Sequence, residues 1–217
     1  MMNDVLAIVV GYLFGSIPFG YIIACAFGIP DIRKYGSGNI GATNAWRVAG
    51  PTAGILVAVC DIGKGVLTVL VASYLGGQLL APEYVKLLAG LAAVLGHLFP
   101  VFLLFKGGKG VNTALGVMVT LVPGHALLAL AVFVLVVVIS RYISLGSILA
   151  AAAFILSILI GKLAGWSDVH PVYIPAGLVL ALLIVIAHRS NIKRLLDGKE
   201  NRFSFRSRTE GEVKSNA

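Results

Sequence analysis

The sequence has 217 residues, of which 59% are hydrophobic and only 12% are charged, and its mean hydropathy is +0.97. This balance excludes an ordinary soluble domain and predicts an all-α polytopic membrane protein with one transmembrane domain. The formal net charge of +8 comes mostly from the C-terminal tail, Arg189 to Lys214, where basic residues beside a bilayer usually contact anionic lipid headgroups. We therefore expect the lipid bilayer, and no nucleic acid, as the partner of these charges.

Seven apolar runs predict seven transmembrane helices, because most of them are near the roughly 20 residues that a spanning helix needs. The runs are 5–27, 52–75, 84–105, 111–122, 125–139, 145–164 and 172–187. With the N-terminus outside and the C-terminus in the cytoplasm, fourteen of the seventeen Lys and Arg residues face the cytoplasm, as the positive-inside rule requires. The weak point is the short run 111–122, since Pro123-Gly124 allows 111–139 to be one kinked helix.

The predicted transmembrane domain covers residues 1–200, and residues 201–217 are predicted to form a basic, polar, disordered cytoplasmic tail. The first run has no basic n-region or cleavage signature, so we interpret it as a retained helix and not as a signal peptide. Pro18 predicts a kink within it. Small residues recur about every four positions in this run and predict close helix packing. They are Gly11, Gly15, Ser16 and Gly20.

A polar loop of three glycines, two hydroxyls and two amides interrupts the first two apolar runs at residues 36–44, here called the first glycine loop. It contains no carboxylate and is followed by Arg47, so its N–H groups, neutral donors and guanidinium suit a bound anion. The alternative is a plain glycine turn. The candidate binding residues are Ser37, Gly38, Asn39, Gly41, Thr43, Asn44 and Arg47. The spacing Gly36-x-Gly38-x-x-Gly41 imitates a dinucleotide fingerprint, but a membrane helix precedes it where that fingerprint needs a strand.

The second apolar run carries Asp61 and Lys64 three residues apart on one helix face. Charges at membrane depth are costly, so they either pair with each other or line a polar cavity. We keep Lys64 as a candidate substrate-binding residue beside the structural ion-pair interpretation.

A second glycine loop, residues 106–113, reads Lys-Gly-Gly-Lys-Gly-Val-Asn-Thr and opens the fourth apolar run. It is no Walker loop, because Lys109 is followed by Gly110 where that motif needs Ser or Thr. Lysines and glycines at a helix start predict a second anion site, with Gly108, Lys109 and Gly110 as candidates. A simple positive-inside loop would explain the lysines but not the glycines.

His188 closes the last apolar run on the cytoplasmic side, and on a continued helix it shares a face with Asn191. The other three histidines, His97, His125 and His170, are interpreted as local or interfacial residues and are left out of the site. The sequence shows no paired carboxylates and no Cys or His cluster, so no metal site is expected.

Two classes of function fit polar, cationic segments at one face of a membrane protein. One is a transporter of phosphate or phosphate esters, and the other is an enzyme that moves an apolar group between phosphorylated molecules. A transporter needs access from both faces and commonly shows two related halves with broken helices, and neither feature is visible in this sequence. The enzyme is therefore favoured.

Four segments together closely resemble the bacterial acyl-phosphate:glycerol-3-phosphate acyltransferases, the PlsY family, over residues from about 5 to 200. They are the first glycine loop with Arg47, Asp61-x-x-Lys64-Gly65, Gly107-Gly-Lys-Gly-Val111 and His188-x-x-Asn191-Ile192. The resemblance implies a multi-pass protein of the bacterial inner membrane whose active site faces the cytoplasm. It implies transfer of a fatty acyl group from acyl phosphate to the 1-position of glycerol 3-phosphate, giving lysophosphatidic acid and phosphate, without a cofactor.

The same resemblance places Ser37, Lys109 and Asn191 around the acyl phosphate, and Arg47, Lys109 and His188 around glycerol 3-phosphate. A soluble acyl-phosphate synthase is a conceivable docking partner. No His-x-x-x-x-Asp pair follows any histidine, so a dedicated general base is not visible. Our hypothesis is that an oxygen of the acyl phosphate takes the proton and that Ser37 positions the donor without forming an acyl-enzyme; His188 is the rival base.

Overall fold

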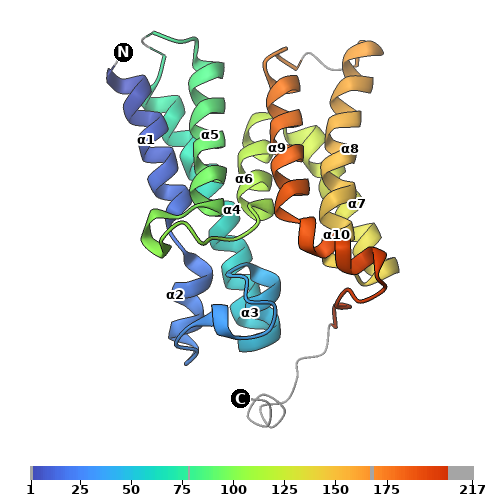
Figure 1. Cartoon of the computed structure of the whole chain (residues 1–217). Coiled ribbons are helices and arrows are strands. Elements are labelled where there is room, and N and C mark those ends of the chain that lie inside the picture. Colours follow the sequence, from blue (N-terminus) through green and yellow to red (C-terminus); the bar gives the residue numbers. More distant parts are fainter. Residues whose placement is uncertain (1, 78, 167–168, 205–217) are drawn as a thin grey trace.

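The computed structural model describes residues 2–77, 79–166 and 169–204, and in this part of the chain all regular structure is helical (Figure 1). The helices are α1 (Met2–Ser16), α2 (Phe19–Ala26), η1 (Ile32–Lys34), α3 (Ala42–Ala49), α4 (Pro51–Leu75), α5 (Pro82–Leu98), η2 (Val101–Leu103), α6 (Val111–Leu121), α7 (Pro123–Ser140), α8 (Ile143–Leu163), α9 (Tyr173–Ala187) and α10 (Arg189–Leu196).

Five helical stretches of the described chain are long and apolar enough to cross a membrane: Met2–Ala26, Pro51–Leu75, Pro82–Leu103, Pro123–Ser140 and Ile143–Leu163. The pair α9 and α10, bent by 59°, makes a sixth if it counts as one span, and α6 is a shorter apolar helix. Residues 111–139 therefore form two helices, because Val122 leaves helical geometry (φ −141°, ψ 67°) and Pro123 begins α7. The molecule is an integral membrane helical bundle.

The first span breaks where the sequence predicts a kink. α1 ends at Ser16 and α2 begins at Phe19, since Pro18 has no N–H to continue the helix. The small residues of α1 pack against α5: a Cβ on Gly15 would lie 2.0 Å from the backbone oxygen of Ala93. Small side chains thus let these two helices approach closely, as expected in lipid.

Both glycine loops lie at the end of the bundle that is opposite to the N-terminus. Figure 1 shows α2, α3 and α10 at this end and the start of α1 at the other. Under the first glycine loop, Ile32, Ile40 and Ala45 are buried together with Ala24 and Val57 in one apolar cluster. This cluster anchors the loop to α2 and α4, so its polar residues are held on a rigid base.

Candidate active site

A cavity of about 420 Å³ lies between the two glycine loops, α4, the end of α7, the start of α8, and α10. Ten of the thirteen site residues that the sequence predicted line it: Ser37, Asn39, Gly41, Thr43, Asn44, Arg47, Lys109, Gly110, His188 and Asn191. Gly38, Lys64 and Gly108 are not among its lining residues. Segments that are up to about 150 residues apart in the sequence thus line one cavity, together with apolar side chains such as Ile55, Phe133 and Val137.

The first glycine loop is held together by Asn44, which is only 1% exposed. Its Oδ1 accepts the N–H of Ser37 at 2.8 Å, and its Nδ2 donates to the carbonyl oxygens of Tyr35 (3.1 Å) and Asn39 (2.8 Å). Asn44 therefore shapes the loop from within, because its amide is used up by backbone groups. Asn44 also lines the cavity, and its direct contact with a substrate stays a prediction.

The N–H groups of this loop are also largely used inside it. The N–H of Gly41 donates to Asn39 Oδ1 at 2.8 Å, and that of Gly38 donates to the carbonyl oxygen of Tyr35 at 3.0 Å. The N–H groups of Ser37, Gly38 and Gly41 are therefore paired inside the loop, and their contact with an anion stays a prediction. What faces the cavity instead is the N-terminus of α3, where Gly41, Ala42 and Thr43 line the wall and the helix dipole favours an anion.

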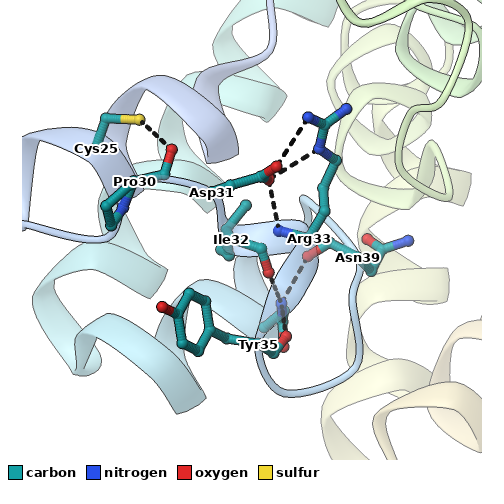
Figure 2. Close-up of polar contacts among 8 residues, drawn as sticks. Cys25, Pro30, Asp31, Ile32, Arg33, Tyr35 and Asn39 are labelled. Carbon is teal, nitrogen blue, oxygen red and sulfur yellow. Dashed lines mark hydrogen bonds and ion pairs between the residues drawn. The ribbon is translucent and has the colours of Figure 1, made fainter. Parts of the chain in front are cut away.

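The charged lead-in to the loop is internally paired. Figure 2 shows Asp31 facing Arg33: Oδ1 lies 2.9 Å from Nε, Oδ2 lies 2.9 Å from Nη2, and Oδ1 also accepts the Arg33 N–H. The hydrogen bond from the Arg33 side chain lowers the pKa of Asp31. Arg33 does not line the cavity, so Arg47 is the arginine that this part of the chain offers to a bound anion.

The second glycine loop packs onto the end of α5. The N–H of Gly108 donates to the carbonyl oxygen of His97 at 3.0 Å, and a Cβ on Gly108 would lie 2.1 Å from His97 Nε2. Gly108 is therefore needed for close packing on His97; it does not line the cavity, and its role in binding stays a prediction. Gly110 takes a left-handed conformation (φ 77°) and starts α6, whose N-terminal residues Val111 and Asn112 line the cavity.

Lys109 projects from this loop across the cavity. Its Nζ donates to Oδ1 of Asn191, so the two predicted catalytic residues from distant segments are in direct contact. Burial lowers the pKa of Lys109 to about 8, the nearby Arg194 and Arg47 also lower it, and Glu200 raises it. Lys109 is consequently a cation that loses its charge only slightly above neutral pH.

Lys64 is placed behind the cavity wall. It is 3% exposed, and its Nζ lies 2.9 Å from Asp61 Oδ1 and 3.0 Å from the carbonyl oxygen of Ile17. The structural ion-pair interpretation is therefore right, and the substrate-binding one has no support in this geometry. His97, which was not a predicted site residue, is buried beside this pair and lines the cavity.

His188 is buried at the end of α9, with Nδ1 at 2.8 Å from the carbonyl oxygen of Ile184. A carbonyl oxygen can only accept, so Nδ1 carries the proton in this contact. Nε2 is then the nitrogen that is left for a ligand in the cavity.

Glu200 is a site residue that sequence reasoning missed. Its carboxylate accepts hydrogen bonds from Asn191 Nδ2 (2.7 Å) and Ser144 Oγ (3.0 Å) and pairs with Arg194 Nε at 2.8 Å. Burial opposes ionisation, but these hydrogen bonds prevail and lower the pKa of Glu200. No sequence signal marks it, because its partners are brought together only when the chain after α10 folds back.

The start of the predicted tail is also part of the site. Phe203 lines the cavity, its ring centroid lies 5.3 Å from that of Trp46, and its N–H donates to the carbonyl oxygen of Arg141 at 2.6 Å. Residues 205–217 of the predicted tail lie outside the described residues.

A second, apolar pocket of about 110 Å³ adjoins the polar cavity between α6, α7, α8 and α9. Four residues line both spaces: Val111, Asn112, Phe133 and Ser147. Deeper in the bundle, its walls are apolar side chains such as Met118, Phe154 and Leu180. Among the described residues, no group of three or more His, Cys, Asp or Glu side chains could hold a metal ion. Fold and site thus define a helical membrane protein whose cationic cavity adjoins a pocket for an apolar group.

Comparison with known proteins identifies the family. Residues 5–198 match the sequence model of the glycerol-3-phosphate acyltransferases, and the chain belongs to this family. It is 47% identical to the glycerol-3-phosphate acyltransferase of Geobacter sulfurreducens (94% of this chain, 99% of the relative) and 49% identical to that of Trichlorobacter lovleyi (88% and 93%).

Two crystal structures of PlsY (YgiH), an integral membrane glycerol 3-phosphate acyltransferase, are similar to this fold. The glycerol 3-phosphate form has a TM-score of 0.81 at 41% identity, covering 93% of this chain and 96% of that one. The lysophosphatidic acid form has a TM-score of 0.79 at 40% identity, covering 93% and 95%.

Proposed function

We propose that this membrane acyltransferase takes its acyl group from acyl phosphate and transfers it to the 1-position of glycerol 3-phosphate. The hydroxyl oxygen attacks the carbonyl carbon, the bond from that carbon to the phosphate oxygen breaks, and lysophosphatidic acid and phosphate leave. The observation that carries the proposal is the joining of the cationic cavity to an apolar pocket, since an acyl phosphate has one charged end and one apolar end.

The cavity suits a reaction between two anions. Arg47 and Lys109 supply positive charge, and the N-termini of α3 and α6 both face the space between them. Such groups hold two phosphates side by side and stabilise charge that develops on the carbonyl oxygen. The proposed roles place Ser37, Lys109 and Asn191 around the acyl phosphate, and Arg47, Lys109 and His188 around glycerol 3-phosphate.

The apolar pocket is proposed to hold the acyl chain next to the headgroup. Its lining side chains, such as Met118, Phe154 and Leu180, would pack against the methylene groups of the chain. Because Ser147 and Asn112 border both spaces, the carbonyl carbon would lie near this boundary, within reach of Lys109 and Ser37.

Phosphate is a good leaving group, so the proposal needs no acyl-enzyme and no cofactor. An oxygen of the acyl phosphate takes the proton of the attacking hydroxyl, and Ser37 positions the donor. The competing assignment makes His188 the general base through Nε2, the nitrogen that its contact with Ile184 leaves open.

The proposed topology has seven spans, formed by the five long stretches, the bent pair α9 and α10, and α6. The N-terminus would lie outside and the site at the cytoplasmic face of the bacterial inner membrane, where a soluble acyl-phosphate synthase could deliver the donor. A reporter fused to the C-terminus tests this topology: protection of the reporter on the cytoplasmic face supports it, and extracytoplasmic activity contradicts it.

The experiment that tests the proposed donor uses the full-length protein in detergent with palmitoyl phosphate, palmitoyl-CoA or no donor. We expect phosphate release and lysophosphatidic acid only from palmitoyl phosphate, dependent on glycerol 3-phosphate and lost in Lys109→Ala. Product from palmitoyl-CoA alone would overturn the donor assignment. Uptake of labelled phosphate esters into proteoliposomes without acyl transfer would support the transporter instead.

A further inference from the structure

Three buried ionisable side chains meet at the cavity wall and are here called the buried junction: Asp61, Lys64 and His97. Asp61 and His97 line the cavity, and Lys64 lies behind them. They are 2%, 3% and 5% exposed, and Lys64 Nζ lies 2.9 Å both from Asp61 Oδ1 and from His97 Nδ1. His97 Nδ1 also lies 3.5 Å from Asp61 Oδ1. When Lys64 is charged, its ammonium group only donates, so His97 Nδ1 accepts from it.

The junction contacts the second glycine loop through His97. The carbonyl oxygen of His97 accepts the Gly108 N–H at 3.0 Å, and that of Leu98 accepts the Gly107 N–H at 3.2 Å. Gly108 also packs directly on the imidazole, as its hypothetical Cβ contact of 2.1 Å with Nε2 shows. The next residue is Lys109, so the orientation of His97 sets where the Lys109 backbone lies.

The junction also contacts the segment that carries the first glycine loop. Lys64 donates to the carbonyl oxygen of Ile17 at 3.0 Å, at the break between α1 and α2. One turn further, Gly20 lies directly under Ile40, since a Cβ on Gly20 would be 1.6 Å from the Ile40 carbonyl oxygen. One ammonium group therefore connects the supports of both loops.

We propose that the buried junction fixes the position of the two glycine loops relative to each other, and that His97 affects the reaction by positioning Lys109. A buried ion pair is seldom more stabilising than apolar side chains of similar size, so stability alone gives little reason for one here. A role in orienting other residues gives a better reason for the ion pair, because groups that support catalytic residues must hold them within a fraction of an ångström. This inference rests on one part of the proposed function, namely that Lys109 is a cation that binds the substrate.

The test compares two substitutions that keep a polar side chain at position 97. His97→Asn can place Oδ1 near the position of Nδ1 and still accept from Lys64, whereas His97→Gln places its amide near Nε2 and lacks that acceptor. We expect kcat to fall at least about tenfold in His97→Gln, because misplacement by about 1 Å can cost about 100-fold. His97→Asn should recover most of the loss.

A second readout does not depend on turnover. The full-length protein in detergent is labelled with an amine-reactive reagent, and the rate at Lys109 is divided by that at the exposed Lys106 in the same loop. We expect this ratio to rise severalfold in His97→Gln and to stay near the wild-type value in His97→Asn. The control is Val85→Ala, which removes buried volume from the other end of α5 without touching the loop.

An unchanged ratio in His97→Gln, or an equal rise in Val85→Ala, would overturn the proposal, as would equal kcat losses in the two His97 variants. Absence of acyl transfer from palmitoyl phosphate by the wild type would instead contradict the proposed function, and the labelling ratios would still report on the junction.

Discussion

Asn191 donates a hydrogen bond of 2.7 Å from Nδ2 to Glu200, and this leaves Oδ1 as the end of its amide that faces Lys109. The two ends of an amide differ, one donating and one accepting, so Glu200 decides which end Lys109 meets. A carboxylate in an anion site is tolerated here because Ser144 and Arg194 also bind it. Glu200 thus fixes the orientation of the Asn191 amide, and the charge of its own carboxylate is balanced by Arg194.

Substituting Glu200 by Gln tests this arrangement. We expect kcat/KM to fall by between about tenfold and about 100-fold, because Asn191 is no longer held in one orientation. The matched control is Asp197→Asn, which removes the same charge from an exposed position at the end of α10. Equal activity of Glu200→Gln and Asp197→Asn would contradict the positioning role.

The rate of the wild type should depend on pH through Lys109. Its pKa is lowered to about 8, so the ammonium form that binds phosphate is present below pH 8 and is lost as the pH rises above it. We expect kcat/KM to decline on the alkaline side with a midpoint near this pH. In Lys109→Arg, whose guanidinium stays charged, the residual activity should show no such decline.

Glu200 also has a predicted effect on this alkaline limb. Because it raises the pKa of Lys109, removal of its charge should lower that pKa further and move the decline to lower pH. A pH–rate profile of Glu200→Gln measures the shift directly. A shift to higher pH would show that Lys109 is not the titrating group.

Arg47→Ala should raise the KM for glycerol 3-phosphate by about tenfold or more, since a hydrogen bond to a charged group contributes about 1.5–3 kcal/mol. The change in kcat should be smaller, because the proposed role of Arg47 is binding. Arg33→Ala is the control: Arg33 is paired with Asp31 and does not line the cavity. An unchanged KM in Arg47→Ala would remove Arg47 from the binding site.

No acylated Ser37 should be found when turnover is quenched with acid and the protein is analysed by mass spectrometry, and initial rates should show a sequential pattern. The reason is that phosphate leaves readily, so a covalent intermediate offers no advantage. Ping-pong kinetics, or an acyl group on Ser37, would contradict direct transfer. Wild-type rates in His188→Gln would in addition exclude His188 as the base.

Packing of α1 on α5 can be tested with two glycine substitutions. Gly15→Ala should lower the free energy of unfolding by about 1–3 kcal/mol, because its Cβ would overlap Ala93. Gly63→Ala is the matched control within a helix, since a Cβ there meets no atom within 4 Å. Thermal unfolding midpoints in detergent measure both. Equal midpoints for the two variants would show that close packing of α1 on α5 does not contribute to the free energy of unfolding.

Local chemistry made much of the fold predictable. A bilayer requires long apolar helices, so each apolar run is helical in the described chain, and the first one forms both α1 and α2. Pro18 and Pro123 mark helix breaks because they cannot donate an N–H. Clustering of Lys, Arg and Gly at polar loops likewise pointed to an anion site, and Ser37, Arg47, Lys109, His188 and Asn191 do line one cavity.

The tertiary structure decided how these groups are used. Asn44 and Gly108 shape the two glycine loops through hydrogen bonds and close packing. Lys64 pairs with Asp61 behind the cavity wall, and Glu200 reaches the site because the chain turns back after α10. Sequence determines which polar groups a segment offers, because residue type and spacing are local. Whether a donor is already satisfied depends on partners tens of residues away, and only packing of the helices fixes those partners.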